Sequence, residues 1–314
     1  MKLKGMTTWK ATAAMLGAAM LALTSAEATQ AGEARSGATG AQAAAERLAP
    51  GDGQFLFDGW AGPALRIWTH APENVGPATP IVIVMHGRGR DADRYRDEWR
   101  DLAEQHGFIL AVPEFDAERF PGANAYNHGY FRDKQGDLRP RPLWSFSAIE
   151  PLFDDLKRRS GSQVEGYGLY GHSAGAQFVH RFVLLTPDAR YRVAISANAG
   201  SYAFPDLTQD YPFGLEGAPV DAAGLEAALQ KPLVLLLGTA DTDPAHPSLP
   251  HGRNADAQGP HRLARGQAFH AAGQAQAERS GVRFGWRVTY APGVAHDNGG
   301  MASFAAPILA GQAK

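Results

Sequence analysis

The stretch from Leu169 to His180, with the sequence LYGHSAGAQFVH, places Ser173 between Gly171 and Gly175. The residues leading into it, GYGLY, are typical of a β-strand, and those that follow, AGAQFVHRFVLL, are typical of a helix. In the pattern Gly-x-Ser-x-Gly between a strand and a helix, the turn is so tight that only small residues fit beside the serine. The stretch alone leaves two interpretations open: a nucleophile, or a small residue in a tight turn.

Strands and helices alternate on both sides of this stretch. Buried strands are expected at PIVIVMHG, FILAVPEF, YRVAISANAG and PLVLLLG, and a late strand at FGWRVTY. Ser147 and Glu150 are spaced as a capping box before one helix, and residues 260–280 predict another. Near the start, FLFDGW and ALRIWTH predict a pair of antiparallel strands joined by a Gly-Pro turn. The pattern predicts an α/β fold with a mainly parallel sheet and helices on both faces.

Size and composition bound the fold and its partners. The chain has 314 residues, of which 44% are hydrophobic, and we expect residues 51–314 to form a single domain. The net charge of -2 gives no electrostatic reason to expect nucleic acid as a partner. The chain has no cysteine, which excludes cysteine nucleophiles and thiolate metal sites.

The first residues predict the compartment. Lys2, Lys4 and Lys10 precede an apolar stretch over residues 11–23, and small residues follow it, so residues 1–28 are interpreted as a secretory signal peptide. The apolar stretch is too short to span a bilayer. Residues 29–50, rich in Ala, Gly, Gln and Glu, are expected to be a disordered lead-in. We therefore expect a secreted or periplasmic protein without a membrane span.

Chemically active side chains follow three of the expected strands, in the order serine, carboxylate, histidine. Ligands of a parallel α/β sheet bind at the carboxyl ends of its strands, where Ser173, Asp241 and His296 stand. A serine needs a base to take its proton, and the imidazole in turn needs a carboxylate that fixes its tautomer. We predict that Ser173 is the nucleophile, His296 the base and Asp241 the acid. Asp243 competes with Asp241 because both follow the same strand.

A serine that attacks an acyl carbonyl also requires hydrogen-bond donors for the oxygen that becomes negative. The backbone N–H of Ala174, at the start of the helix, is one candidate. The loop HGRG after the strand IVIVM offers the other, which we expect to be the backbone N–H of Arg88. The alternative is that this loop is an ordinary turn between a strand and a helix.

Two long segments, residues 114–146 and 198–230, are rich in aromatic residues, Gly and Pro. Long ordered loops in a compact domain are often binding surfaces. We expect Tyr130, Trp144 and Tyr202 from these segments to contact the substrate. The alternative is that these aromatic side chains only pack the loops onto the body of the domain.

Taken together, MHGRG, GHSAGAQF, GTADTD and GVAHD resemble the oxyanion loop, nucleophile, acid and base of the α/β-hydrolase fold serine esterases. The resemblance extends from about Gln54 to Ile308. In layout the chain is most similar to exported poly(3-hydroxybutyrate) depolymerases and feruloyl esterases. This resemblance implies hydrolysis of small or polymeric esters, including polyhydroxyalkanoate-type or aromatic esters, through an acyl-enzyme and without a cofactor.

Other functions remain open on the sequence. An acyltransferase, a thioesterase or a peptidase could use the same three residues. His246, His251 and His261 raise the alternative of a metal-binding protein, but their spacing matches neither a helical pair nor a zinc finger, and we expect no metal site. A hydrolase-like binding protein would have lost a member of the triad, and all three are present.

Overall fold

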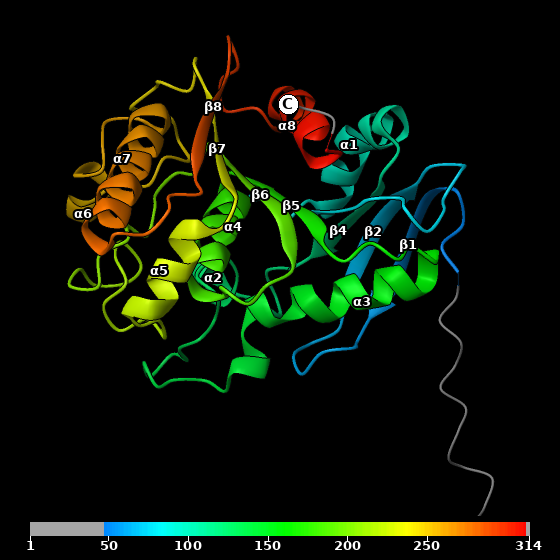
Figure 1. The fold of residues 1–314 in the computed structure, drawn as a ribbon, viewed down its shortest axis with the longest axis horizontal. Coiled ribbons are helices and arrows are strands. Elements are labelled where there is room, and N and C mark those ends of the chain that lie inside the picture. The colour runs from blue at the N-terminus through cyan, green and yellow to red at the C-terminus, as the bar shows by residue number, and fades with distance from the viewer. Residues whose placement is uncertain (1–46, 312–314) are drawn as a thin grey trace, which may run out of the picture. The chain divides into compact units, whose positions relative to one another are not determined.

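A computed structural model describes residues 47–311. Its centre is an eight-stranded sheet with the order β1-β2-β4-β3-β5-β6-β7-β8 (Figure 1). The strands are β1 (Gly51–Phe57), β2 (Leu65–Ala71), β3 (Ile81–Met85), β4 (Ile109–Glu114), β5 (Tyr167–His172), β6 (Tyr191–Ala197), β7 (Leu233–Gly238) and β8 (Arg287–Ala291). The predicted antiparallel pair is confirmed as β1 and β2, and β2 continues antiparallel onto β4. From β4 to β8 all neighbours are parallel, as the buried apolar runs predicted.

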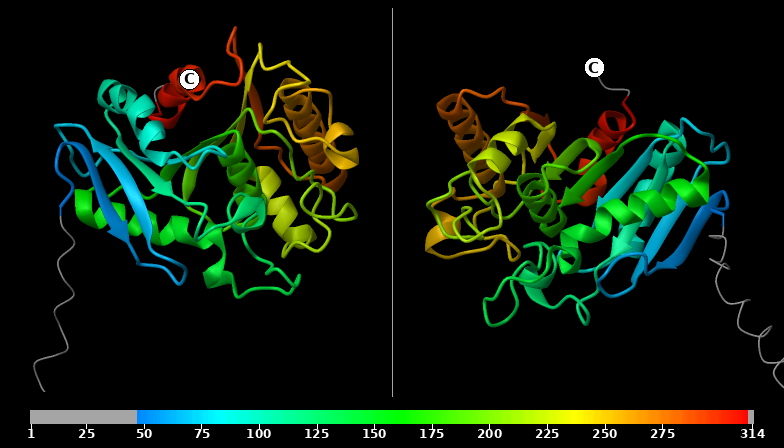
Figure 2. Two further views of the ribbon diagram at one scale, coloured as in Figure 1. Left: turned by 180° about the vertical axis from the view of Figure 1, so that it is seen from behind. Right: turned by 60° about the horizontal axis from the view of Figure 1, so that its bottom comes forward.

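The sheet carries an apolar core on each of its faces, as expected for parallel strands. One core packs against α1 (Ala92–His106) and α8 (Asn298–Leu309), which contact each other. The other core packs against α3 (Ile149–Ser160), α4 (Ala174–Leu185), α5 (Ala222–Gln230) and α7 (Arg262–Ser280). Figure 2 shows α1 and α8 on the same side of the sheet from both directions. The sheet is therefore covered on both faces.

Two sequence expectations about helices were wrong. The predicted capping box does not form, because the Ser147 hydroxyl donates to the Arg141 carbonyl and Glu150 accepts from the Tyr167 hydroxyl at 2.6 Å. The segment 198–230 is not all loop, because its end forms α5, whose first turn is capped by Asp221 accepting from the Gly224 N–H at 2.8 Å. A side-chain cap therefore marks the start of α5, whereas α3 continues directly from η2 (Ser145–Ala148) without a side-chain cap.

The segment that follows β4 contains only short elements. They are α2 (Gly122–Ala125) and the 3-10 helices η1 (Arg141–Leu143) and η2 (Ser145–Ala148). A further short helix, α6 (Arg253–Asp256), lies between β7 and α7. These irregular segments follow the carboxyl ends of the strands, where a site is expected.

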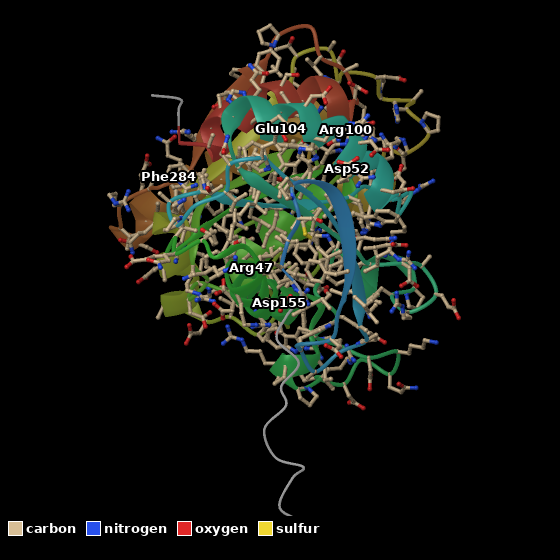
Figure 3. All side chains as sticks on the ribbon, turned by 90° about the vertical axis from the view of Figure 1, so that its right-hand side faces the viewer. Arg47, Asp52, Arg100, Glu104, Asp155 and Phe284 are labelled. Carbon is tan, nitrogen blue, oxygen red and sulfur yellow. The ribbon has the colours of Figure 1, made fainter. Side chains whose placement is uncertain are left out.

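The edge of the sheet is tied to α1 by a cluster of charged side chains. His70 of β2 lies 2.6 Å from an Asp52 carboxylate oxygen and 2.9 Å from one of Glu104. Arg100 adds a bond of 3.2 Å to Asp52. Figure 3 shows Asp52, Arg100 and Glu104 close to one another, where β1 passes α1. The cluster links the antiparallel strand pair to the first helix.

The predicted signal peptide, residues 1–28, lies outside the described residues, and so do residues 29–46 of the predicted lead-in. The last residues of the predicted lead-in, 47–50, are described. Among them, the Leu48 N–H donates to the Arg159 carbonyl at 3.1 Å, and the Leu48 side chain packs against the core. Within residues 47–311, none of the helices combines the length and the apolar character that crossing a membrane requires.

Candidate active site

Ser173 occupies a sharp turn between β5 and α4. Its φ of 58° and ψ of -114° lie in a region that residues other than glycine rarely adopt. The two flanking glycines are required for space: a Cβ on Gly171 would lie 2.2 Å from the Gly175 carbonyl oxygen, and one on Gly175 would lie 2.0 Å from the Met85 carbonyl oxygen. The turn is thus pressed against the end of β3, which holds the Ser173 side chain out of the sheet.

A continuous chain of hydrogen bonds joins three strand ends. His296 Nε2 lies 3.0 Å from Ser173 Oγ, and His296 Nδ1 lies 2.8 Å from Asp241 Oδ2. The Asp241 carboxylate is buried. Asp243 is exposed and accepts instead from the Ala245 N–H at 2.8 Å. Of the two aspartates that follow β7, Asp241 is therefore the one that contacts the histidine.

Asn198, at the end of β6, connects the two loops that carry the carboxylate and the histidine. Its Oδ1 accepts from the Gly238 N–H at 2.8 Å, and its Nδ2 donates to the Ala295 carbonyl at 3.0 Å. Gly238 ends the strand before Asp241, and Ala295 precedes His296. Asn198 is fully buried and has a positive φ of 52°. The amide of Asn198 thus bonds both loops at once and holds them at a fixed distance from each other.

The surroundings of His296 favour its neutral form. Burial lowers the pKa of the imidazole, and the nearby positive charge of Arg262 lowers it further, whereas the hydrogen bond to Asp241 raises it. The net result is a pKa below the ordinary value. At neutral pH the imidazole is therefore unprotonated and free to accept the proton of Ser173.

Arg88 and Ala174 line the same cavity as Ser173. Neither amide has an acceptor in the described part of the chain. The Arg88 loop has no room for a side chain at Gly87, where a Cβ would lie 2.7 Å from the Tyr95 hydroxyl. Both residues thus carry an unengaged backbone donor, and their role in an oxyanion site stays a prediction.

His86, which precedes this loop, fixes its path. The His86 side chain is fully buried, and its Nε2 accepts from the Phe115 N–H at 3.0 Å. The His86 carbonyl accepts from the Tyr126 hydroxyl at 2.7 Å. Burial lowers the pKa of His86 to about 4, so the ring is neutral and its acceptor nitrogen is available at neutral pH.

A cavity of about 500 Å³ opens beside Ser173. Arg88 and Arg90 bring positive charge to it, and neither forms an ion pair within the described residues. Its wall is made by residues from the loops after β3, β4, β6 and β7 and from the first turn of α4: Arg88, Arg90, Ala117, Gly122, Ala123, Tyr126, Asn127, His128, Ser173, Ala174, Gln177, Ser201, Pro212, Phe213, Ser248, Leu249 and Pro250. The cavity combines apolar walls with several hydrogen-bonding groups.

The three aromatic residues expected to contact the substrate do not line this cavity. Tyr202 is fully buried and stacks on Phe269, and Trp144 is buried with its indole N–H donating to the Arg139 carbonyl at 2.8 Å. Tyr130 lies under the Arg139 guanidinium, 3.5 Å from its ring centre. The positions of these rings agree with the alternative that they pack the loops onto the body of the domain, and a contact with substrate stays an untested expectation.

The three histidines considered for a metal site have separate partners. His246 Nδ1 lies 3.1 Å from the Ser248 hydroxyl, His251 pairs with Asp256 at 3.1 Å, and His261 caps α7 by accepting from the Ala264 N–H at 3.2 Å. No group of three or more potential metal ligands occurs among residues 47–311. The geometry gives no support to the metal-binding alternative.

Sequence reasoning missed three residues of this site: Asn198, Gln177 and Arg262. Gln177 lies one helical turn after Ser173, so its spacing in GHSAGAQF could have indicated it. Its Oε1 accepts from the Asn127 amide at 3.1 Å, which leaves the Nε2 hydrogens for the cavity. Arg262 bonds Asp241, 21 residues away, and no local pattern indicates that contact.

Comparison with known proteins gives relatives among solved structures only. No family model matches the sequence, and no curated protein does. Poly(aspartic acid) hydrolase-1 from Sphingomonas sp. KT-1 is 50% identical, with 83% of this chain and 99% of that chain covered and a TM-score of 0.82. A poly(3-hydroxybutyrate) depolymerase from Bordetella parapertussis is 31% identical over 83% and 89% of the two chains, with a TM-score of 0.78. An S-formylglutathione hydrolase from Agrobacterium tumefaciens, 15% identical over 85% and 96%, shares the fold with a TM-score of 0.54.

Proposed function

The chain belongs to the α/β-hydrolase fold enzymes, and from this premise we propose that it is a serine hydrolase that cleaves carboxylic esters through an acyl-enzyme. The observation that carries the proposal is the hydrogen-bond chain from Ser173 through His296 to Asp241, with distances of 3.0 and 2.8 Å. A nucleophile, a base and an orienting acid in this geometry are the components of acyl transfer.

In the proposed first step the Ser173 oxygen attacks the substrate carbonyl while His296 Nε2 takes the hydroxyl proton. The His296 Nδ1–H donates to Asp241, which stabilises the imidazolium that forms. The carbonyl oxygen becomes negative and accepts from the Arg88 and Ala174 amides. Loss of one such donor typically costs roughly 2.7 to 4 kcal/mol of transition-state stabilisation.

The tetrahedral intermediate then collapses. His296 returns the proton to the leaving alcohol as the ester bond breaks, and Ser173 keeps the acyl group. Water next gives a proton to His296 and attacks the acyl carbonyl, and collapse of the second intermediate releases the carboxylic acid and restores the serine. These steps use only side chains and amides of the chain, and the proposed reaction needs no cofactor.

The substrate we propose is a small or polymeric ester. One solved relative is a poly(3-hydroxybutyrate) depolymerase, so a polyhydroxyalkanoate-type ester is the polymer to test first. The cavity of about 500 Å³ is large enough for one repeat unit of such a chain. A thioesterase or an acyltransferase with the same triad is distinguished by product analysis, the latter with an added alcohol as acceptor.

A second candidate, hydrolysis of an amide in an acidic polymer, is favoured by a specific observation. Arg88 and Arg90 line the cavity without an ion-pair partner within residues 47–311, and the solved relative at 50% identity is a poly(aspartic acid) hydrolase. The Arg90 guanidinium donates to the carbonyls of Phe120 and Gly122, so Arg88 is the side chain with which a carboxylate-bearing substrate would pair. The amide candidate and the ester candidate share every step at Ser173 and differ in the leaving group.

We also propose that the enzyme is exported to the periplasm or the medium. The support is the sequence pattern of residues 1–28, with lysines before a short apolar stretch. The absence of cysteine is compatible with any redox compartment. Cell fractionation of a strain expressing the full chain tests this point, because export predicts cleavage near residue 28 and activity outside the cytoplasm.

The function is tested with purified enzyme on a panel of p-nitrophenyl esters, 3-hydroxybutyrate oligomers and poly(aspartic acid). Ser173→Ala is expected to abolish hydrolysis of every substrate that the wild type cleaves, while circular dichroism shows an unchanged fold. Asp241→Asn is expected to be strongly impaired, and the matched variant Asp243→Asn is expected to stay near wild type. Turnover that persists in Ser173→Ala would contradict the proposed mechanism.

A further inference from the structure

Arg262, the first residue of α7, is a charged side chain in the interior beside the proposed triad. Its Nη1 lies 3.2 Å from Asp241 Oδ1, the carboxylate oxygen that does not face His296. Both partners are buried, with side-chain exposures of 0% for Arg262 and 2% for Asp241. The acid of the triad is thus one half of a buried ion pair.

The other end of the guanidinium is anchored to the loop that follows β7. Arg262 Nη2 donates to the Ser248 hydroxyl at 2.9 Å, and that hydroxyl lies 3.1 Å from His246 Nδ1. Asp241 is the carboxylate that Arg262 pairs with among the described residues. A rigid planar group held at two points fixes the orientation of the carboxylate that it bonds.

Elementary electrostatics gives this arrangement two effects. First, the bond to Oδ1 restricts rotation of the Asp241 carboxylate, which keeps Oδ2 directed at the imidazole. Second, the positive charge of the guanidinium partly cancels the electrostatic effect of the negative carboxylate on His296. In a buried site solvent screens this effect only weakly. A carboxylate alone would draw a proton onto the imidazole, whereas the ion pair draws it less strongly.

We propose that Arg262 is a positioning residue of the triad, which fixes Asp241 through its second oxygen and offsets the carboxylate's attraction for a proton on His296. The proposal rests on the proposed serine hydrolase function. It assigns Arg262 no contact with the substrate, because the side chain lies behind Asp241 and does not line the cavity.

Two other titratable groups, both histidines, face His296. The ring of His172, in β5, lies 4.5 Å from that of His296, and the ring of His246 lies 5.1 Å away, in the loop after β7. Burial lowers the pKa of His172 well below its ordinary value, so it is neutral near pH 7. Asp241 and Arg262 act on the pKa of His296 in opposite directions, and His246 adds a smaller effect in the same direction as Arg262.

The test compares Arg262→Gln with Arg262→Lys and with the matched control Arg265→Gln. Arg265 is also a fully buried arginine of α7, but it bonds Asp256 and the carbonyls of Gly200 and Pro250 rather than the triad. The protonation midpoint of His296 is read by NMR in each protein, with the resonance identified by its loss in His296→Asn. This readout requires no turnover.

Arg262→Gln is expected to raise the His296 midpoint by roughly one pH unit, from the loss of a buried charge at close range. The acid limb of kcat/KM is expected to move by the same amount, with kcat at its optimum lower by roughly tenfold as the carboxylate loses its orientation. Arg262→Lys keeps the charge but cannot hold Asp241 and Ser248 together, so it should lower kcat while the midpoint stays near wild type.

Arg265→Gln is expected to lose stability without moving the His296 midpoint. The proposal is overturned if Arg262→Gln leaves the midpoint at the wild-type value, or if Arg265→Gln moves it equally. If Arg262→Gln does not fold, Arg262→Lys decides, because wild-type kcat in that variant contradicts the positioning role. A wild-type enzyme inert on all acyl substrates, with the NMR shift present, would overturn the hydrolase function and leave the ion-pair effect standing.

Discussion

Replacement of Asn198 by alanine tests how the two loops that carry Asp241 and His296 are held together. The change removes two hydrogen bonds, a buried one from the Gly238 N–H at 2.8 Å and a part-buried one to the Ala295 carbonyl at 3.0 Å. The buried Gly238 N–H is left without an acceptor, whereas the Ala295 carbonyl keeps the Asp297 N–H as a donor at 3.0 Å. Each buried group left without a partner costs about 1 to 3 kcal/mol. The φ of 52° adds to the cost, because alanine tolerates the left-handed region less well than asparagine.

The expected loss for Asn198→Ala is therefore about 1.5 to 4.5 kcal/mol of unfolding free energy, from one unpaired buried N–H and one lost ordinary hydrogen bond. The matched control is Ser196→Ala on the same strand, where one buried hydroxyl bonds the Ala176 carbonyl at 3.0 Å and touches neither catalytic loop. That control should lose about 1 kcal/mol. Chemical denaturation at pH 7.5 measures both changes, with thermal scans as a check that unfolding is reversible.

The same variant makes a prediction about catalysis. Because Gly238 and Ala295 lead into Asp241 and His296, a small displacement of either loop should lower kcat by roughly 10- to 100-fold. Ser196→Ala should keep kcat near wild type even after correction for its stability. The reasoning is refuted if Asn198→Ala unfolds at the wild-type denaturant midpoint, or if its kcat equals that of Ser196→Ala.

Three further changes are expected to act through named contacts. Gly175→Ala should be inactive or fail to fold, because the added Cβ would lie 2.0 Å from the Met85 carbonyl oxygen; soluble yield and activity measure this, and a stable active variant would contradict the geometry. Acid should destabilise the protein through His86: its pKa of about 4 lies below the unfolded value near 6.5, so the unfolded chain gains the proton first as pH falls. Between those two pKa values the protein should lose about 3 kcal/mol of unfolding free energy. Urea denaturation midpoints measured from pH 7 to 4.5 test this loss, and the midpoint of His86→Gln should depend less on pH than that of the wild type. Gln177→Met should raise KM more than it lowers kcat on substrates with a second carbonyl, because it removes the free amide hydrogens; equal KM values in the two proteins would exclude this contact.

The fold and the three residues of the proposed triad could be predicted from the sequence because each rests on a local pattern. A strand is recognised by its apolar run, and the residue that follows a parallel strand lies at a known edge of the sheet. Ser173 needed its two glycines, its place between strand and helix, and the carboxylate and histidine that follow later strands. His296 needed only its position after the last strand.

The choice between Asp241 and Asp243 depended on the path of a loop, which the sequence does not determine. The same holds for Tyr202, which faces the core because the loop after β6 runs over α7. The roles of Asn198 and Arg262 could not be predicted from the sequence for a different reason. Their partners lie at separations of 97 and 21 residues, and a contact at that range leaves no periodic signal. The N-cap Asp221 is a sequence signal for the start of α5, but the segment before it is rich in Gly and Pro, so no helix was predicted there.

Covalent trapping tests the central claim most directly. The enzyme is incubated with a fluorophosphonate, or quenched in acid during turnover of a p-nitrophenyl ester, and its intact mass and peptides are measured. The account predicts one adduct per chain, located on Ser173, and none in Ser173→Ala. Its formation should slow strongly in His296→Asn. An adduct on another residue, or turnover of the ester with no covalent intermediate and no reaction at Ser173, would contradict the account.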